Sequence, residues 1–551
     1  MQINEIERAG LFPKLSEGQI ETLSESGSVR EIRKGEYLVK VGERNHNIFV
    51  VLKGSLSILN NDLKEIAIHH PGEFTGNIDN LSDRTAIYNA VATSDSLILQ
   101  IAQPQLRDII SNNQDLSEIL LRTFLLRRTF ELESNIGALK LLGSRFCPNT
   151  FKLREFFSKN HVQYTWVDLE MDETSEAILS EFGVSASDTP LVITHQKTIF
   201  KNPTLEEIAD NIGLTSLSGD DVYDLIVVGA GPAGLAASVY ASSEGLKVIT
   251  IDSIGPGGQA GTSSKIENYL GFPMGISGSD LANNAFIQAQ KFGCVISIPH
   301  NAKALRVENN AFHLELATGK VIKGSAVIAA TGAQYRKLPL DNLVQFEGQG
   351  VYYGASNMEA QLLSGKEAVI VGGGNSAGQA AIFLAEKSSK IHLVIRGSDL
   401  SASMSTYLIN RIVHHPKIEL HIHTEVKKLE GDSWLRKVTL ECNQSGEIHT
   451  CNVSDLFLFL GALPCTEWLA DVTCLDPKGF IYTGRDIPAD GLETYKWPYS
   501  YPPQSLETCV PGLFAVGDIR SGSVKRVASA VGEGSMAVSQ VHAFLSNQRV
   551  F

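Results

Sequence analysis

Two glycine-rich turns in the C-terminal part of the chain have the spacing that binds dinucleotide phosphates. The first cradle, residues 229–234, follows the apolar run 225–228, and the second cradle, residues 372–377, follows the apolar run 368–371. Glycines at such positions let the backbone approach a pyrophosphate, whose charge then lies at a helix N-terminus. The residues expected to contact the phosphates are Gly229, Gly231 and Gly234 in the first cradle, and Gly372, Gly374, Asn375 and Ser376 in the second. Two such sites in tandem predict a flavoprotein that takes hydride from a pyridine nucleotide.

The residue at the end of the next strand distinguishes the two nucleotides. Strand 247–251 ends in Asp252, at the spacing at which a carboxylate meets the adenosine ribose hydroxyls. Strand 390–395 ends instead in Arg396, whose guanidinium can pair with a 2′-phosphate and favour NADPH over NADH. The alternative for Arg396 is a solvated cation at a strand end. We expect FAD at the first cradle and NADPH at the second.

Several separated motifs carry a resemblance to a known family. Gly257, Gly258 and Gln259 lead toward Asn268, a strand at 327–330 leads into Thr331 and Gly332, and the segment 512–518 ends in Asp518. Together with the first cradle, this order resembles the low-molecular-weight thioredoxin reductase family over about residues 222 to 545. The resemblance implies that Asp518 bonds the flavin ribityl chain, that the residues from Gly257 to Gln259 approach the diphosphate and isoalloxazine, and that Asn268, Thr331 and Gly332 complete the FAD site. It also implies a homodimer.

The reactive disulfide of that family is missing from this chain. Thioredoxin reductases carry a C-x-x-C just before the second cradle, which passes electrons from the flavin by disulfide exchange. Gly354 and Asn357 stand at these two positions, and the stretch 259–264 after the glycine pair also lacks cysteine. The seven cysteines are scattered, which is typical of reduced thiols in a cytoplasmic protein.

A segment in the middle of the chain places one cysteine in a reactive context. Residues 140–150 predict a strand, a turn and a helix that begins after Cys147, where the helix amides favour a thiolate. With the segments 163–169 and 188–194, it resembles a glutaredoxin/thioredoxin fold in monothiol form, and Thr189-Pro190 matches the cis-proline loop of that fold. Either Cys147 is redox-active, with a second thiol from another domain, glutathione or a partner, or the module serves for packing or docking.

The N-terminal part resembles a cyclic-nucleotide-binding β-roll. The resemblance rests on Gly-containing turns at 34–36, 41–43, 53–54 and 72–74, and on Arg84-Thr85-Ala86. It implies that Glu73 accepts the ribose 2′-hydroxyl and that Arg84, next to Thr85, pairs with the cyclic phosphate. Asp79 and Asp83 in the intervening loop would weaken anion affinity. The alternative is a degenerate β-roll that mediates dimerisation or docking.

The predicted fold is multidomain. A jelly-roll-like β-roll with a C-terminal helix occupies 10–135, and a small thioredoxin-like α/β domain occupies 138–213. A discontinuous FAD-binding domain follows at 222–337 and 461–551, around an NAD(P)H-binding domain at 338–460; both are Rossmann-like. The 551 residues carry a net charge of −14, which argues against non-specific binding to nucleic acid or anionic membranes. No signal peptide or apolar span is evident, so we expect a cytoplasmic protein.

Three functions are compatible with these features. The first is transfer of hydride from NADPH to FAD and onward to a thiol/disulfide acceptor such as a thioredoxin-like protein, without the usual C-x-x-C. The second is a diaphorase-type or ferredoxin–NADP reductase, since members of this fold without the dithiol serve that role; an acidic partner would need a basic patch such as Lys525 and Arg526. The third is a redox sensor gated by a cyclic nucleotide.

Overall fold

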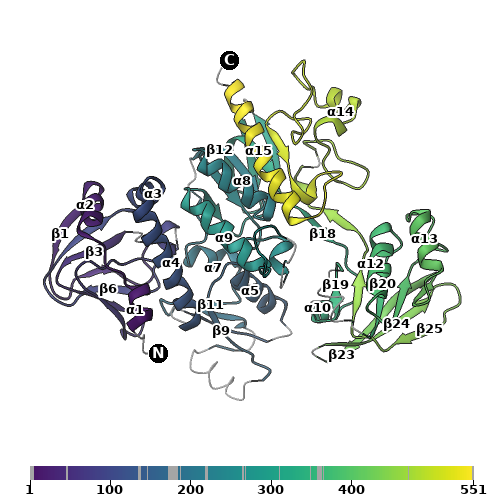
Figure 1. The fold of residues 1–551 in the computed structure, drawn as a ribbon, viewed down its shortest axis with the longest axis horizontal. Coiled ribbons are helices and arrows are strands. Elements are labelled where there is room, and N and C mark those ends of the chain that lie inside the picture. The colour runs from purple at the N-terminus through teal and green to yellow at the C-terminus, as the bar shows by residue number, and fades with distance from the viewer. Residues whose placement is uncertain are drawn as a thin grey trace. The chain divides into compact units, whose positions relative to one another are not determined.

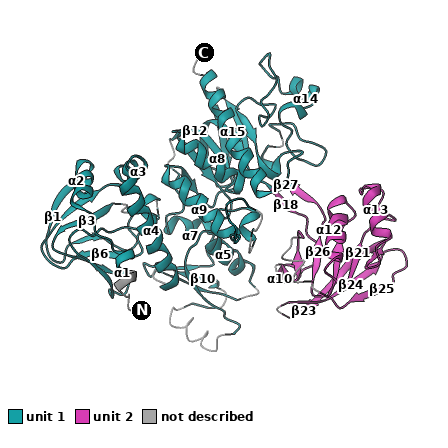
Figure 2. Ribbon diagram, in the orientation of Figure 1, with its two compact units in different colours: residues 1–332, 464–551 teal, residues 333–463 magenta. Residues whose placement is uncertain are grey.

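The chain folds into two units, which Figure 2 colours separately: residues 1–332 with 464–551, and residues 333–463. The computed structural model describes residues 5–44, 47–82, 84–134, 138–144, 147–171, 184–185, 188–217, 221–263, 266, 269–308, 311–347, 349–355, 363, 365–432, 434–469 and 471–548. We call the two parts the first unit and the second unit. Among the described helices, none combines the length and the apolar character needed to cross a bilayer.

The N-terminal part of the first unit is an antiparallel β-roll between helices. One sheet has the order β1-β7-β3 and the other β2-β6-β4-β5. Strand β3 (Ile48–Lys53) reads as a continuous apolar run because both of its faces are buried: Ile48 and Val50 face the helices, and Phe49 and Val51 face the second sheet. The remaining elements are β1 (Ser28–Ile32), β2 (Tyr37–Val39), β4 (Leu56–Leu59), β5 (Glu65–His69), β6 (Asn89–Ala92), β7 (Ser96–Ile101), α1 (Glu5–Leu11), α2 (Glu17–Ser26), α3 (Gln103–Asn112) and α4 (Gln114–Ser134).

A small α/β domain follows α4 in the first unit. Its sheet has the order β11-β10-β8-β9, in which β8 and β9 are parallel and the other pairs are antiparallel. The side chains of Leu153, Phe156 and Phe157 pack α5 onto the sheet, within a core that continues into the next domain. The elements are β8 (Leu139–Leu142), α5 (Pro148–Lys159), β9 (Tyr164–Val167), β10 (Leu191–Ile193), β11 (Ile199–Lys201) and α7 (Leu205–Asn211).

A seven-stranded sheet organises the rest of the first unit. Strands β14, β13, β12, β17 and β28 run parallel, and the antiparallel strands β16 and β15 extend the sheet beside β17. Figure 1 shows α15 lying along α8. The elements are β12 (Val222–Val228), β13 (Val248–Ile251), β14 (Val295–Ser297), β15 (Ala302–Glu308), β16 (Ala311–Leu316), β17 (Val321–Ala329), β28 (Leu513–Ala515), α8 (Pro232–Ser243), α9 (Gly278–Lys291) and α15 (Val527–Gln548).

The second unit is a parallel sheet between a helical layer and a small antiparallel sheet. The parallel order is β19-β26-β20-β21-β22, and the antiparallel order is β23-β24-β25. Along β20, Ala368 and Ile370 face the helices, whereas Val369 and Val371 face the antiparallel sheet. The elements are β19 (Val351–Tyr352), β20 (Glu367–Val371), β21 (Lys390–Val394), β22 (Ile418–His421), β23 (Thr424–Gly431), β24 (Leu435–Cys442), β25 (Ile448–Cys451), β26 (Leu456–Leu458), α12 (Asn375–Ala385) and α13 (Thr406–Val413).

Candidate functional site

The first cradle is a tight backbone turn between β12 and α8. Gly229 has φ +109, in the left-handed region that favours glycine, and Gly231 is the N-cap residue of α8. A Cβ on Gly234 would lie 1.8 Å from the carbonyl oxygen of Gly229, so no side chain fits there. Gly258 (φ +53) lies against Gly231, because a Cβ built on it would be 3.1 Å from the Gly231 Cα. This bare backbone surface at a helix N-terminus suits a pyrophosphate.

Two carboxylates at strand ends flank the first cradle. Asp252, directly after β13, accepts hydrogen bonds from the backbone N–H groups of Ala230 (2.8 Å), Ile254 (3.0 Å) and Gly255 (2.9 Å). Asp518, after β28, is partly buried and makes no hydrogen bond to a described side chain or backbone group. Burial raises the pKa of Asp518, Lys525 opposes this effect, and Glu533 adds to it. A partly desolvated carboxylate without a donor suits the hydroxyl groups of a ligand.

The other residues predicted for FAD lie around the same turn, with one exception. The N–H of Gly257 (φ +107) donates to the carbonyl of Ala230 (2.8 Å), and Gln259 follows in the same turn. Thr331 donates through its hydroxyl to the carbonyl of Cys465 (2.7 Å), and Gly332 accepts the Cys465 N–H (3.1 Å). Asn268 lies outside the described residues. The described set therefore fits a dinucleotide such as FAD.

The second cradle has the same order of elements but a looser turn. Gly372 has φ +148, and a Cβ built on it would lie 2.6 Å from the carbonyl oxygen of Phe459. Gly374 is the N-cap residue of α12. A Cβ on Gly374 would meet only the Ser403 carbonyl at 3.9 Å. Asn375 accepts the N–H of Ser405 through its side-chain oxygen (2.8 Å), and Ser376 is exposed. Exposed backbone at a helix start again suits a nucleotide phosphate.

The predicted phosphate-binding arginine of the second unit shares its loop with a carboxylate. Arg396 is exposed just after β21 and forms no ion pair with a described residue. Three residues later, the Asp399 carboxylate accepts hydrogen bonds from the Ser401 hydroxyl and N–H, which together lower the pKa of Asp399. Asp399 therefore stays ionised near the position expected for a 2′-phosphate. No motif in the sequence singles out this residue.

The stretch that holds the dithiol in the resembled family contains no thiol here. Gly354 follows the short strand β19, and Asn357 lies outside the described residues. Next to this strand, the rings of Tyr353 and Tyr335 stack with centroids 5.5 Å apart and an interplanar angle of 9°.

Cys147 is the N-cap residue of α5 and is partly exposed. Partial burial opposes its thiolate, but hydrogen bonds from the Thr150 backbone and hydroxyl and from the Asn149 backbone outweigh it. These bonds hold the pKa of Cys147 below its usual value. The thiol is therefore more nucleophilic at neutral pH than an ordinary cysteine.

A pair of neighbouring thiols was not predicted from the sequence. The sulfur atoms of Cys474 and Cys509 lie 3.1 Å apart in the first unit, and Cys509 is fully buried. Burial, then Cys509 itself, raises the pKa of Cys474, so the Cys474 thiol is protonated at neutral pH. The two residues are 35 positions apart, so no local spacing signals the contact.

In the β-roll, the residues predicted to bind a cyclic nucleotide do not all lie at one cavity. Arg84 and Thr85 line one small cavity with Thr75, Asn77 and Asp79, whereas Glu73 does not. The Glu73 carboxylate instead accepts the His70 N–H (2.9 Å) and lies 3.3 Å from the Arg8 guanidinium.

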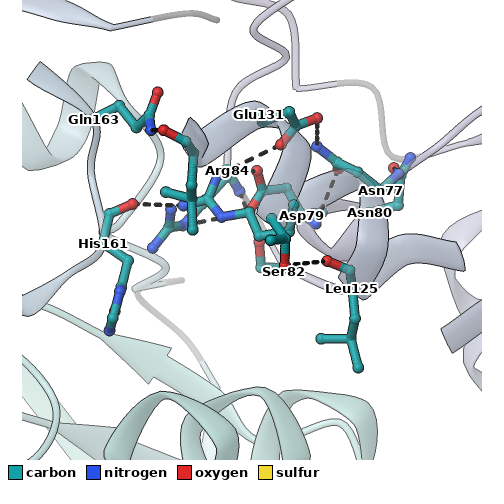
Figure 3. A network of polar contacts seen from close by, with 12 residues as sticks. Asn77, Asp79, Asn80, Ser82, Arg84, Leu125, Glu131, His161 and Gln163 are labelled. Carbon is teal, nitrogen blue, oxygen red and sulfur yellow. Dashed lines mark hydrogen bonds and ion pairs between the residues drawn. The ribbon is translucent and has the colours of Figure 1, made fainter. Parts of the chain in front are cut away.

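Arg84 joins the β-roll to the small α/β domain. Its guanidinium donates to the carbonyl of Asn160 (2.6 Å), at the end of α5, and lies 3.6 Å from Asp79. Figure 3 shows Arg84 between Asp79 and the segment around His161. The Thr85 N–H reaches the Ile212 carbonyl (3.3 Å) of the same domain. Burial lowers the pKa of Arg84 to about 10, so it remains charged at neutral pH.

Comparisons with known proteins show which families this chain is similar to. The profile of the pyridine nucleotide-disulphide oxidoreductase family matches residues 223–534, and that of the cyclic nucleotide-binding domain matches residues 29–113. A thioredoxin reductase of Mycoplasmopsis pulmonis is 32% identical over 58% of this chain and 97% of its own length. A thioredoxin reductase of Bacillus subtilis is 31% identical over 60% of this chain and 96% of its own.

Solved structures give the same result for the fold. Thioredoxin reductase from Streptococcus pyogenes MGAS5005 is 26% identical with a TM-score of 0.50, covering 60% of this chain and 100% of that one. Thioredoxin reductase from Giardia duodenalis is 25% identical with a TM-score of 0.51, covering 59% and 100%. The comparisons confirm the predicted multidomain organisation: a β-rich cyclic nucleotide-binding domain at the N-terminus and a Rossmann-type part like that of thioredoxin reductases.

Proposed function

Because the chain belongs to the pyridine nucleotide-disulphide oxidoreductase family, and is an FAD-dependent oxidoreductase, we propose that NADPH is its reductant and a thiol/disulfide protein its acceptor. Bound FAD would take the hydride from NADPH and supply two electrons. The observation that supports a thiol/disulfide acceptor is the lowered pKa of Cys147 at the start of α5, in the same unit as the first cradle. A homodimer stays a prediction from the resemblance.

The chain's own residues have distinct tasks in this proposal. The backbone of Gly231, Gly257 and Gly258 leaves room for the FAD pyrophosphate at the N-terminus of α8. Asp252 holds the turn and meets the ribose, and Asp518 binds the ribityl hydroxyls. In the second unit, the start of α12 binds the NADPH pyrophosphate, and Arg396 pairs with the 2′-phosphate.

We propose that Cys147 passes the electrons to the acceptor protein. Its thiolate would attack a disulfide of a thioredoxin-like protein, which forms a mixed disulfide and displaces the other sulfur as a thiolate that takes a proton from water. The two electrons that bound FAD would supply, with one further proton, would cleave the mixed disulfide into the Cys147 thiolate and the second thiol. This sequence needs no second cysteine beside Cys147, in agreement with Thr150 at the position of the resolving residue.

The test is NADPH-driven reduction of thioredoxin by the full-length flavoprotein. Cys442→Ser is a matched control, because Cys442 is another accessible thiol with a lowered pKa, caused by hydrogen bonds from Ser445, but it lies in the second unit. We expect Cys147→Ser to abolish turnover and Cys442→Ser to preserve it. Equal turnover in wild type and Cys147→Ser would overturn the role of Cys147. Absence of turnover in all three, with normal flavin reduction by NADPH, would overturn the thiol acceptor.

A second candidate acceptor is an acidic one-electron carrier such as ferredoxin. This alternative is favoured by Gly354, which stands where the resembled family has a redox cysteine, and by the exposed cations Lys525 and Arg526 after β28. Docking through these cations predicts ferredoxin turnover that falls steeply between low and high salt. Turnover that is insensitive to salt and to Lys525→Glu would contradict it.

We further propose that the β-roll regulates the flavoenzyme through Arg84. A cyclic phosphate can pair with this guanidinium only in place of its present partners, Asn160 and Asp79. Binding of cAMP or cGMP would therefore loosen the contact between the β-roll and the small α/β domain that carries Cys147. A change in thioredoxin turnover on adding either nucleotide should disappear in Arg84→Gln and persist in Arg44→Gln, which removes an exposed ion pair to Asp210 between the same domains. No effect of either nucleotide on wild type would contradict the regulation.

A further inference from the structure

Three histidines in the second unit gather where its two sheets meet. His392 is on β21, His421 ends β22, and His449 is on β25 of the antiparallel sheet. Their ring centroids lie 5.2 to 5.8 Å from one another. His392 is 3% exposed, on the face of β21 that otherwise packs the apolar core between the sheets. The nucleotide chemistry of this unit uses none of these side chains.

The geometry of the cluster matches a metal-binding site. The nitrogen His392 Nδ1 lies 3.0 Å from His421 Nε2 and 3.5 Å from Glu419 Oε2, and the last two atoms are 3.8 Å apart. Four ligands with bonds of about 2.1 Å around a tetrahedral Zn²⁺ are separated by about 3.4 Å. All three measured separations lie near this value, so one ion can reach the three atoms after small side-chain rotations.

A carboxylate orients the central histidine. Glu367, at the start of β20, accepts a hydrogen bond from His392 Nε2 at 3.2 Å. This contact places the ring proton on Nε2 and leaves the Nδ1 lone pair directed at Glu419 and His421. Metal-binding histidines commonly donate their second N–H to a carboxylate in this way. The neighbouring cation Lys390, which contacts Glu419 at 2.6 Å, is 41% exposed and can move into solvent.

We propose that the second unit binds a divalent transition metal ion of the zinc class through His392, Glu419 and His421. The three ligands come from the neighbouring strands β21 and β22 of the parallel sheet. His449 and Cys451 form a second set of possible ligands with His392, but neither of them joins Glu419 and His421 in one set. Three protein ligands leave one position of a tetrahedral ion for water, and the ion would link β22, at the edge of the sheet, to β21.

The proposal is tested on the full-length flavoprotein, treated with a chelator, reloaded with Zn²⁺ alone and separated from free metal. We expect one zinc per chain and a rise of at least about 4 °C in the thermal midpoint of the second unit, from binding to the folded state only. His392→Gln and His421→Gln should each lose the zinc and the thermal shift. His414→Gln is the matched control, since His414 is an exposed histidine on the neighbouring segment bonded to its own helix carbonyl. Flavin reduction by NADPH verifies that each variant is folded.

Two results would overturn the proposal. Wild type that retains no zinc after reloading excludes the site, and zinc retained equally by His392→Gln and His421→Gln excludes these ligands. Replacement by Co²⁺ tests the ligand set: we expect visible absorption without thiolate charge transfer. A thiolate charge-transfer band that is lost in Cys451→Ser would overturn the assignment of Glu419 and His421 in favour of His449 and Cys451.

Discussion

The two cradles occupy the same place in their domains, yet the first is tightly packed and the second is open. At the last position of the six-residue cradle, the first has Gly234, where a Cβ would overlap the Gly229 carbonyl, and the second has the buried Ala377. At the following strand end, Asp252 is fixed by three backbone N–H groups, whereas Arg396 is exposed and forms no ion pair with a described residue. The same local motif thus supports two kinds of site.

This difference fits two kinds of ligand. A flavin that stays bound through many turnovers benefits from a rigid turn, because little conformational freedom is lost on binding. A nucleotide that must leave after each hydride transfer benefits from a looser turn and a solvent-exposed charge, whose ion pairs contribute little net energy. We therefore expect substitutions at the first cradle to affect folding and FAD retention, and those at the second to affect nucleotide kinetics and leave FAD content unchanged.

The largest effect is expected for Gly234→Ala. Its methyl group would force apart α8 and the Gly229 carbonyl, at a cost of about 3 kcal/mol in the free energy of unfolding. The purified variant should contain little FAD, as measured by absorbance at fixed protein concentration. The counterpart is Ala377→Gly, which should cost about 1 kcal/mol and leave FAD content unchanged. Equal FAD loss in both variants would break the contrast between the cradles.

The next effect concerns the thiols of the first unit. Cys147 has a lowered pKa, whereas burial raises the pKa of Cys294, next to the Thr250 hydroxyl on β13, to about 11. At pH 7 a larger fraction of Cys147 is thiolate, so iodoacetamide should label it about 100-fold faster than Cys294. Between pH 7 and 10, labelling of Cys147 should level off while that of Cys294 continues to rise. Peptide mass spectrometry measures both, and similar pH profiles would contradict the assignment.

A smaller effect is expected for Arg396→Ala. Removing a charge-assisted hydrogen bond to the 2′-phosphate, of about 1.5 kcal/mol, should raise the KM for NADPH about tenfold. The KM for NADH should not change, because NADH has no 2′-phosphate. Arg411→Ala, which removes an exposed arginine of α13, controls for the general loss of positive charge. An equal rise in KM for both nucleotides would mean that Arg396 does not distinguish them.

The sequence predicts the cradles because each depends on residues within one strand-turn-helix. The strand-end acid Asp252 lies 18 to 23 residues after the turn at Gly229 through Gly234, and the structure joins them directly. Other contacts join segments that are distant in the sequence. Examples are the hydrogen bond from Arg84 to Asn160 and the contact between the sulfur atoms of Cys474 and Cys509. Such contacts leave no periodic or spacing signal, because they depend on how whole domains and loops pack.

The same limit explains the residues missed near the cofactor sites. Cys465 reaches Thr331 and Gly332 only because the chain returns to the first unit after the 131 residues of the second. The histidine cluster is likewise assembled from three strands of the second unit. In the β-roll, Arg84 and Thr85 line one cavity, and their role in binding a cyclic nucleotide stays a prediction. The sequence pattern gave no sign that Arg84 already has a partner in another domain.

The smallest effect is expected for Asp399→Ser, in the loop that also holds Arg396. Asp399 is held ionised by Ser401 and shares its loop with Arg396, so it should repel a 2′-phosphate bound there. For charges about 7 Å apart in water, this repulsion is about 0.6 kcal/mol, so Asp399→Ser should lower the KM for NADPH about threefold. Because the interaction crosses solvent, 0.5 M salt should remove most of the difference between variant and wild type, by screening. The KM for NADH should stay constant at both salt concentrations. If Asp399→Ser also lowers the KM for NADH, its effect comes from loop structure and not from charge, and the open second cradle would then select its nucleotide through Arg396 alone.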